Sequence, residues 1–234
     1  MTAVLAAECV AKSFGARRVL TAASLRAVAG ETRALVGRNG EGKSTLLKIA
    51  AGILQPDGGA VLLDGEGRPG RSFASLARAG LFYLPDHGLL APAFSVRRQL
   101  AMLAARFGGG DPERAAERTG VAAILDRRPT TLSGGERRRA ELAAAIVRRP
   151  RCLLADEPYR GVAPLDAELL TDVFRELAAA GCAVVITGHE LRTVLAAVDH
   201  VTWCAGGTTH ELGPPALATS DFRFRREYLG PRWV

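Results

Sequence analysis

The chain has 234 residues, of which 48% are hydrophobic and 24% charged, an ordinary globular composition with enough apolar material for a core. Its net charge of +7 comes almost wholly from arginines scattered in short clusters that form no aromatic-interleaved nucleic-acid motif, so no nucleic acid is expected as a partner. No apolar stretch approaches the roughly 18 residues that cross a bilayer, and the first five residues lack the pattern of a secretion signal, so we expect a cytosolic protein.

Short apolar segments alternate with helical patterns along most of the chain. Strands are predicted at residues 31–36, 60–64, 80–84, 151–155, 182–187 and 200–205. Helices are predicted at residues 43–51, 95–107, 134–149, 165–180 and 189–197. The last three helices alternate with buried strands, which is typical of an α/β fold whose largely parallel sheet is covered by helices on both faces.

The stretch 86–131 differs from its surroundings, because it carries helical patterns broken by glycines and prolines and no strand pattern. We interpret it as a helical sub-domain inserted into a core formed by residues 1–85 and 132–234. The chain 1–234 is then a single domain.

The four cysteines are far apart and show neither metal-ligand nor redox spacing. All lie in or beside apolar runs, so we predict buried, reduced thiols in strands at Cys9, Cys152, Cys182 and Cys204.

The segment from Gly37 to Ser44, Gly-Arg-Asn-Gly-Glu-Gly-Lys-Ser, matches the phosphate-binding P-loop pattern that follows a strand and opens a helix. Glycines are needed because backbone N–H groups must point at phosphate oxygens, which a Cβ would obstruct. Lys43 can reach the β- and γ-phosphates, and Ser44 can ligate Mg²⁺. The sequence therefore predicts a nucleoside triphosphate site.

Two carboxylates end the apolar strand 151–155. Asp156 is placed to hold the Mg²⁺ hydration shell beside Ser44, and Glu157 is placed to polarise the water that attacks the γ-phosphate. Two acids can also form a plain solvated strand end; it is the P-loop that favours the catalytic interpretation.

The segment Leu132-Ser133-Gly134-Gly135-Glu136 contains the S-x-x-E pattern of a helix capping box. A capping box does not explain two glycines in the first turn, because glycines weaken a helix. Without side chains, however, they leave the N-terminus of the helix accessible to a phosphate. Here the sequence resembles the ABC ATPase family, whose signature this segment is. The motifs follow the family's order over nearly the whole chain.

The resemblance implies a P-loop NTPase fold with an antiparallel β portion at its N-terminus, ATP and Mg²⁺ as cofactors, and a head-to-tail dimer. The catalytic groups implied are Lys43, Glu157 and His189, the family's switch histidine, and the metal ligands are Ser44, Asp86 and Asp156. The nucleotide is expected to contact Phe14, Gly37, Arg38, Asn39, Gly40, Glu41, Gly42, Lys43, Ser44 and Thr45 of one subunit and Ser133, Gly134 and Gly135 of the other.

Within the family, residues 132–139 and 156–164 resemble the lipopolysaccharide-export ATPases. The ending at residues 226–230 resembles these and the branched-chain amino-acid importer ATPases.

The sequence departs from the family pattern at two positions. Asp86 stands where the family has glutamine; an ionised carboxylate can only accept hydrogen bonds, whereas an amide also donates them. Ala163 stands where the family has an aspartate that communicates between the two sites of the dimer, and we interpret the nearby Asp166 as a helix first-turn acid. We expect Asp86 still to sense Mg²⁺ and communication between the sites to be looser.

The function implied is the motor of an ABC transporter that pairs with an integral membrane subunit and a second ATPase subunit at the inner face of the cell membrane. A soluble single-cassette ATPase, for example of the iron–sulfur assembly type, and a weakly hydrolysing ATP switch are the alternatives. The transported substrate, its direction, and a homodimer against a heterodimer are open at this point.

Overall fold

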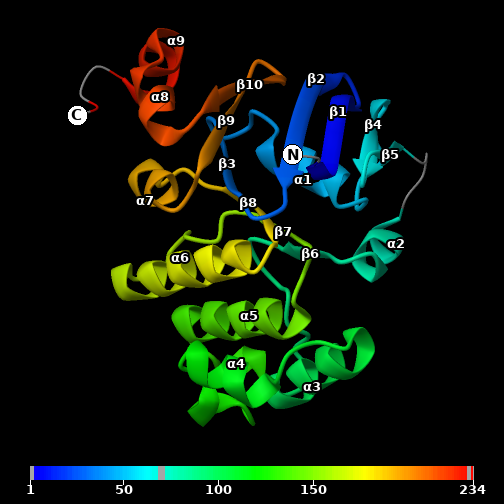
Figure 1. The fold of residues 1–234 in the computed structure, drawn as a ribbon, viewed down its shortest axis with the longest axis vertical. Coiled ribbons are helices and arrows are strands. Elements are labelled where there is room, and N and C mark those ends of the chain that lie inside the picture. The colour runs from blue at the N-terminus through cyan, green and yellow to red at the C-terminus, as the bar shows by residue number, and fades with distance from the viewer. Residues whose placement is uncertain (1–2, 68–71, 231–232, 234) are drawn as a thin grey trace.

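The computed structural model describes residues 3–67, 72–230 and 233, so the outer ends of the predicted core lie outside the described residues. A single mixed sheet runs through the molecule, with helices stacked against it (Figure 1). Its strands, in spatial order, are β5 (Glu66–Gly67), β4 (Gly58–Leu63), β1 (Ala3–Phe14), β2 (Arg17–Val28), β10 (Thr208–Gly213), β9 (His200–Ala205), β3 (Thr32–Val36), β8 (Ala183–Thr187), β7 (Cys152–Ala155) and β6 (Leu81–Leu84).

The half of the sheet from β9 to β6 is parallel throughout, as predicted. In it, Ala34 of β3 lies between Ile186 of β8 and Val201 of β9. The strands of this half are short apolar runs buried on both faces, which is the pattern that identified them in the sequence. A mainly parallel α/β core is therefore confirmed.

The N-terminal half of the sheet is antiparallel, built from β1, β2, β4 and β5. The hairpin of β1 and β2, with 12 residues in each strand, was not identified from the sequence pattern. Register shifts between Ala7 and Val10 interrupt the alternation of buried and exposed side chains that marks a strand.

The same irregularity makes one cysteine prediction wrong. Cys9 lies in the left-handed region at φ 47°, its amide donates to Ser24 Oγ at 2.9 Å, and its side chain is exposed. Cys152, Cys182 and Cys204 are buried free thiols, as predicted. Burial raises the pKa of Cys182 to about 12 and that of Cys204 to about 11, so both stay protonated at neutral pH.

The five predicted helices are present, each within two residues of its expected limits. They are α1 (Lys43–Ala50), α3 (Val96–Phe107), α5 (Gly134–Arg148), α6 (Pro164–Ala179) and α7 (Leu191–Ala196). The sequence pattern missed the shorter elements α2 (Phe73–Arg78), α4 (Pro112–Arg118), α8 (Pro215–Ser220), α9 (Phe222–Phe224), the 3₁₀ helices η1 (Ala122–Ile124) and η2 (Pro129–Thr131), and the π-helical turn η3 (Arg225–Leu229). No helix of the described residues is long and apolar enough to cross a bilayer.

Two hydrophobic cores lie on opposite faces of the parallel half of the sheet. Ala34 and Val36 of β3 pack with residues of α5, α6 and α7, whereas Leu35 between them packs with α1, β1 and β2. Each core is buried because side chains alternate across a strand. The first core continues away from the sheet into α3 and α4, which pack on α5 at the lower end of Figure 1.

Candidate nucleotide site

The P-loop joins the end of β3 to the start of α1, as predicted. Gly42 immediately precedes the helix at φ 98°, in the left-handed region that favours glycine. A Cβ at Gly42 would also lie 2.6 Å from Leu20 Cδ2 of the strand packed behind the loop. The glycine therefore serves both the backbone turn and the packing, and leaves the amides of the turn uncovered.

Lys43 is buried in this loop, with 5% of its surface exposed. Its Nζ donates to the carbonyl oxygens of Gly37 at 2.8 Å and Arg38 at 3.2 Å. These acceptors carry no formal charge, so the ammonium keeps a full positive charge inside a glycine turn. This cradle fits a polyphosphate.

Asp156 organises the floor of the site and is 3% exposed. Its Oδ1 accepts hydrogen bonds from Ser44 Oγ at 2.9 Å and Thr187 Oγ1 at 2.8 Å, and its Oδ2 accepts one from Tyr83 at 3.0 Å. Burial and the Asp156 charge raise the pKa of Tyr83, which keeps its hydroxyl a donor. Because the Ser44 hydroxyl donates its hydrogen bond to Asp156, the lone pairs of its oxygen remain available to a cation. Oxygen atoms are the ligands that Mg²⁺ prefers.

Glu157 follows in a strained conformation, with φ 50° at a non-glycine residue, which costs on the order of 1–3 kcal/mol. Its amide donates to Thr187 Oγ1 at 2.8 Å, and its Oε2 lies 2.8 Å from Nδ1 of His189. The carboxylate is 14% exposed. The single hydroxyl of Thr187 thus fixes the backbone of Glu157 and the side chain of Asp156 together.

These groups open into one cleft of about 530 Å³. Nine of the predicted site residues line it, which are Asn39, Gly40, Gly42, Lys43, Ser44, Thr45, Asp86, Glu157 and His189. Arg17, Val19 and Arg160 complete the lining and were not predicted. Segments separated by more than 100 residues in the sequence therefore converge on the P-loop.

Three residues predicted at the nucleotide have side chains directed elsewhere. Arg38 donates to the carbonyl of Glu227 at 2.6 Å, and Glu41 accepts from the amide of Gly206 at 2.7 Å, so only their backbone groups are left for phosphates. Phe14 is 49% exposed at the end of β1, 5.8 Å from the ammonium of Lys12. Its partner across the hairpin, Arg17, lines the cleft.

The turn at residues 132–136 starts α5 as a complete capping box. The amide of Glu136 donates to Ser133 Oγ at 3.2 Å, and the amide of Ser133 donates to Glu136 Oε2 at 2.7 Å. Ser133 and Gly134 are exposed, and neither they nor Gly135 are among the described residues that line the cleft. The helix start is therefore intact, and its glycine turn lies outside the cleft formed at its own P-loop.

A family model described as ABC transporter matches residues 20–160, the range that holds the P-loop, the capped glycine turn and both carboxylates. The chain belongs to the ABC transporter family. Within it, the chain is an ATP-binding subunit, and the resemblance identified from the sequence is confirmed.

Curated relatives of this ABC subunit include both exporters and importers. It is 30% identical to the lipopolysaccharide export system ATP-binding protein LptB of Haemophilus influenzae over 98% of each chain. It is 35% identical to the ribose import ATP-binding protein RbsA of Pseudomonas putida, over 88% of this chain and 42% of that protein. A crystallised ATP-binding cassette of an ABC transporter in its ADP conformation has a TM-score of 0.84 at 24% identity, over 98% and 100% of the two chains, which confirms the fold.

In this ABC subunit Asp86, in place of the family glutamine, lies at the mouth of the cleft just after β6. Its Oδ2 is 2.7 Å from Arg160 Nη1 and 3.2 Å from His87 Nε2. Its Oδ1 is buried without a hydrogen-bond partner among the described residues. A buried, unpaired carboxylate oxygen beside Ser44 and Asp156 fits a cation or its water shell, because leaving it unpaired is costly.

The second departure, Ala163, lies just before α6 and gives that helix no side-chain cap. Asp166 is in the first turn of α6, as predicted, and pairs with Arg139 of α5 at 2.7 Å. A Cβ at Gly135 would lie 2.6 Å from the Asp166 carboxylate. The second turn of α5 and the first turn of α6 are therefore joined by an ion pair within one subunit.

Sequence reasoning missed four residues that organise the site. Tyr83 and Thr187 are the last polar residues of predicted strands, and a polar residue at the carboxyl end of a parallel strand was the available signal. Arg138, which is buried and paired with Glu141 at 3.0 Å, donates to the Asp86 carbonyl at 2.8 Å. Arg160 could not be predicted as a site residue, because a single arginine in a basic chain forms no recognisable pattern.

Proposed function

We propose that this ABC subunit binds ATP with Mg²⁺ in the cleft and hydrolyses it to drive transport through a separate membrane subunit. The observation that carries the proposal is a cleft lined by a buried ammonium, a serine hydroxyl and a histidine-held glutamate, in which the hydroxyl is bonded to the buried carboxylate of Asp156. These are the three groups that phosphoryl transfer to water requires.

Each group has a defined role. Lys43 and the amides of the P-loop bind the phosphates, and Ser44 and Asp156 hold Mg²⁺, with the unpaired Oδ1 of Asp86 as a further acceptor. Bound Mg²⁺ supplies charge neutralisation at the β- and γ-phosphates. Glu157 accepts a proton from the attacking water, and His189 orients that carboxylate through its 2.8 Å contact.

The second half of the site is proposed to come from another ATPase subunit. The support is the exposed turn of Ser133 and Gly134, a capped helix start without a bulky side chain that lies outside its own cleft. The N-terminal end of a helix attracts anions. In a head-to-tail dimer, this turn would close over the phosphate held by Lys43 of the other copy or of a different cassette.

The membrane partner is proposed from the relatives, whose names assign them to lipopolysaccharide export and ribose import systems. We propose that the helical region 86–131, which holds α3 and α4, is a sub-domain that receives this partner, and that residues 1–85 and 132–234 form the ATP-binding core. The subunit would then be cytoplasmic and peripheral at the inner face of the cell membrane.

The test compares the purified wild-type chain with Lys43→Ala. We expect the wild type to bind and hydrolyse Mg-ATP, and the variant to lose both while keeping its circular dichroism spectrum. In fractionated cells that produce it naturally, the chain should sediment with membranes. ATP binding that is equal in both proteins would contradict the nucleotide site, and a chain found only in the cytosolic fraction would contradict the membrane partner.

A weakly hydrolysing switch is the second candidate, and it is favoured by the two departures at Asp86 and Ala163. In a single turnover such a switch would close on ATP but release phosphate slowly. Fast phosphate release by the wild type would exclude it.

A further inference from the structure

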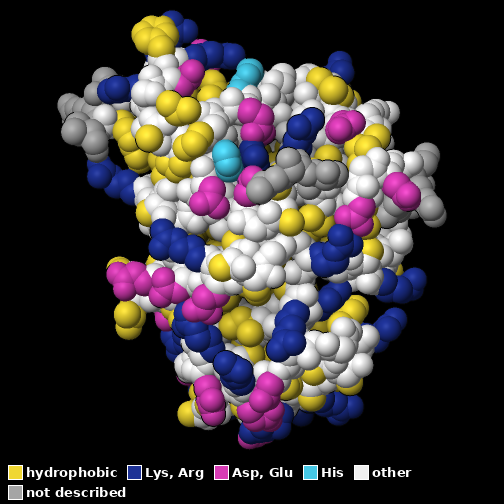
Figure 2. Space-filling model, viewed as in Figure 1, with side chains coloured by type: hydrophobic (Ala, Val, Ile, Leu, Met, Phe, Trp, Pro, Cys, Tyr) yellow, Lys and Arg dark blue, Asp and Glu magenta, His cyan; other side chains and the backbone are white. Residues whose placement is uncertain are grey.

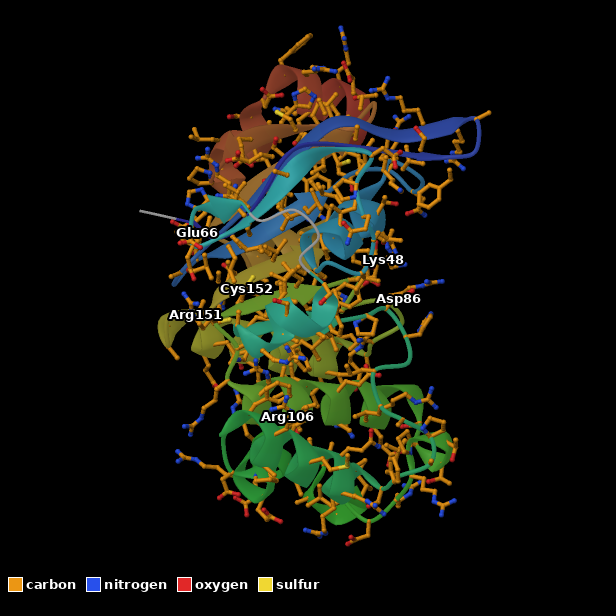
Figure 3. The ribbon with its side chains drawn as sticks, turned by 90° about the vertical axis from the view of Figure 1, so that its right-hand side faces the viewer. Lys48, Glu66, Asp86, Arg106, Arg151 and Cys152 are labelled. Carbon is orange, nitrogen blue, oxygen red and sulfur yellow. The ribbon has the colours of Figure 1, made fainter. Side chains whose placement is uncertain are left out.

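An ion pair lies inside the nucleotide cleft, between Asp86 and Arg160. Arg160 Nη1 is 2.7 Å from Asp86 Oδ2, and both residues line the cleft together with Lys43, Ser44 and Glu157. Figure 3 places Asp86 on the opposite side of the view from Arg151, which forms a similar 2.7 Å pair with Asp64 outside the cleft. The chain thus offers a matched control pair.

The Asp86 carboxylate is unfavourable in a cleft for a polyphosphate, because it adds negative charge beside the anion. One of its oxygens is buried and unpaired among the described residues, while the other is held by Arg160. The nearby His87 is 77% exposed and 3.2 Å away, so it offers weaker compensation. Arg160 is therefore the principal cation that balances Asp86 before nucleotide binds.

The backbone of Arg160 is held in place by its neighbours, whereas its guanidinium group is free to move. Its amide donates to the carbonyl of Glu157 at 3.1 Å, and its neighbour Tyr159 is 2% exposed with its hydroxyl 3.0 Å from Thr171 Oγ1. The Arg160 side chain is 55% exposed. The backbone of Arg160 thus belongs to the turn that follows Glu157, the proposed general base. The exposed guanidinium of Arg160 can change partner without movement of that backbone.

We infer that Arg160 senses the terminal phosphate of ATP, pairing with Asp86 before nucleotide binds and with the γ-phosphate afterwards. A guanidinium bonds a phosphate through two parallel hydrogen bonds, and a doubly charged phosphate outcompetes one carboxylate oxygen. The exchange leaves the Asp86 carboxylate free to coordinate Mg²⁺ or to accept a hydrogen bond from its water. This inference rests on the proposed function and deepens it.

The exchange would reach the signature turn through Arg138. This buried arginine of α5 donates to the carbonyl oxygens of Pro85 at 3.2 Å and Asp86 at 2.8 Å. Arg138 thus connects the backbone of Asp86 to α5, the helix that begins at Gly134, so a backbone shift of Asp86 on release from Arg160 would be passed to that helix.

The test measures dissociation constants for ATP and ADP, with and without Mg²⁺, in wild type, Arg160→Ala, Arg160→Lys and the control Arg151→Ala. We expect Arg160→Ala to weaken ATP binding roughly tenfold, the value of one charge-assisted hydrogen-bonded contact, and to change ADP binding little. Arg160→Lys keeps the charge without the paired geometry and should fall between. Arg151→Ala should leave both constants unchanged.

Asp86→Asn gives the reciprocal result. Without Mg²⁺ it removes the competitor for Arg160, so ATP should bind more tightly than in wild type, and the gain should be larger for ATP than for ADP. In the double variant with Arg160→Ala that preference for ATP should vanish, because only the relief of the Asp86 charge remains and it acts on both nucleotides. Equal losses of ATP and ADP affinity in Arg160→Ala would show that Arg160 only neutralises the Asp86 charge, and would overturn the inference. Unchanged affinity for both nucleotides in this variant would overturn it as well. If the wild type itself binds neither nucleotide, the proposed function fails instead. Should Arg160→Ala not fold, Arg160→Lys and the Asp86→Asn reciprocal decide.

Discussion

The cleft at the P-loop and the turn at the start of α5 differ in how far one chain completes them. At the cleft, Lys43, Asp156 and Glu157 are buried or nearly so, and Asp156 is tied to side chains from two other strands, β6 and β8. The turn at Ser133–Gly135 has its capping box, but its residues are not among the described residues that line the cleft. Under the proposed function both bind phosphate, and only the cleft holds the proposed catalytic groups.

The proposed function makes hydrolysis by this chain depend on assembly with a second subunit. Figure 2 shows positive and negative side chains interspersed on the face it draws, without a single large patch of one charge. The predictions below separate the two sites, from the largest effect to the smallest.

Glu157→Gln tests the cleft alone. Losing the proposed general base should lower turnover by roughly 10²–10⁴ while binding persists, and ATP should hold the variant as a dimer. Phosphate release and size-exclusion chromatography with light scattering measure the two effects. Turnover equal to wild type would remove Glu157 from its assigned role.

Gly134→Asp tests the turn alone. A Cβ at Gly134 meets no atom within 4 Å, and an acid in the first turn stabilises a helix, so the fold should persist. The added charge should repel the partner's phosphate and lower turnover by about 10², the scale of a lost anion-stabilising group. ATP affinity of the monomer should not change.

Gly134→Ala is the matched control, since it adds a methyl group without charge. If it reduces turnover as much as Gly134→Asp, the turn acts through shape and not through its attraction for phosphate.

Thr187→Val tests the link inside the cleft. Thr187 is fully buried, and its hydroxyl joins Asp156 Oδ1 to the amide of Glu157. Its loss removes the acceptor of the Glu157 amide and one of the two hydrogen bonds that Asp156 Oδ1 accepts, so the free energy of unfolding should fall by about 1–3 kcal/mol. Turnover should drop more than ATP affinity. Urea denaturation and steady-state kinetics measure both, and an unchanged unfolding midpoint would contradict the link.

Ala163→Ser gives the smallest effect. A serine at the uncapped start of α6 should raise the free energy of unfolding by about 1 kcal/mol. Ala163→Asp should cap the helix equally and, in addition, increase the cooperativity of hydrolysis with ATP concentration. Equal cooperativity in both variants would show that Ala163 does not loosen communication between the sites.

The sequence identified the regular parts of the molecule for a physical reason. The strands of the parallel half are continuous apolar runs, and the long helices carry both a periodic apolar face and end signals such as the capping box at Ser133 and Glu136. The hairpin of β1 and β2 was missed because bulges break its alternation, and the same bulge exposes Cys9.

Site residues that belong to short sequence motifs could be predicted, whereas residues that only the fold brings together could not. Residues of the P-loop and the paired acids are neighbours in sequence, so their spacing reveals them. Tyr83 and Thr187 join Asp156 from two other strands, and Arg160 meets Asp86 across 74 positions. Such meetings depend on strand order and on loop turns, which local patterns do not encode.

The most direct test of a site completed between subunits mixes two inactive variants, Lys43→Ala and Gly134→Asp. Each alone should hydrolyse almost no ATP, because every site in it lacks either the ammonium or the open turn. In the mixed dimer, the intact cleft of one chain meets the intact turn of the other, so the mixture should recover a clear fraction of the wild-type rate. Labelled copies of the two variants are used to demonstrate that subunits exchange. If they exchange and no activity is recovered, the account is contradicted.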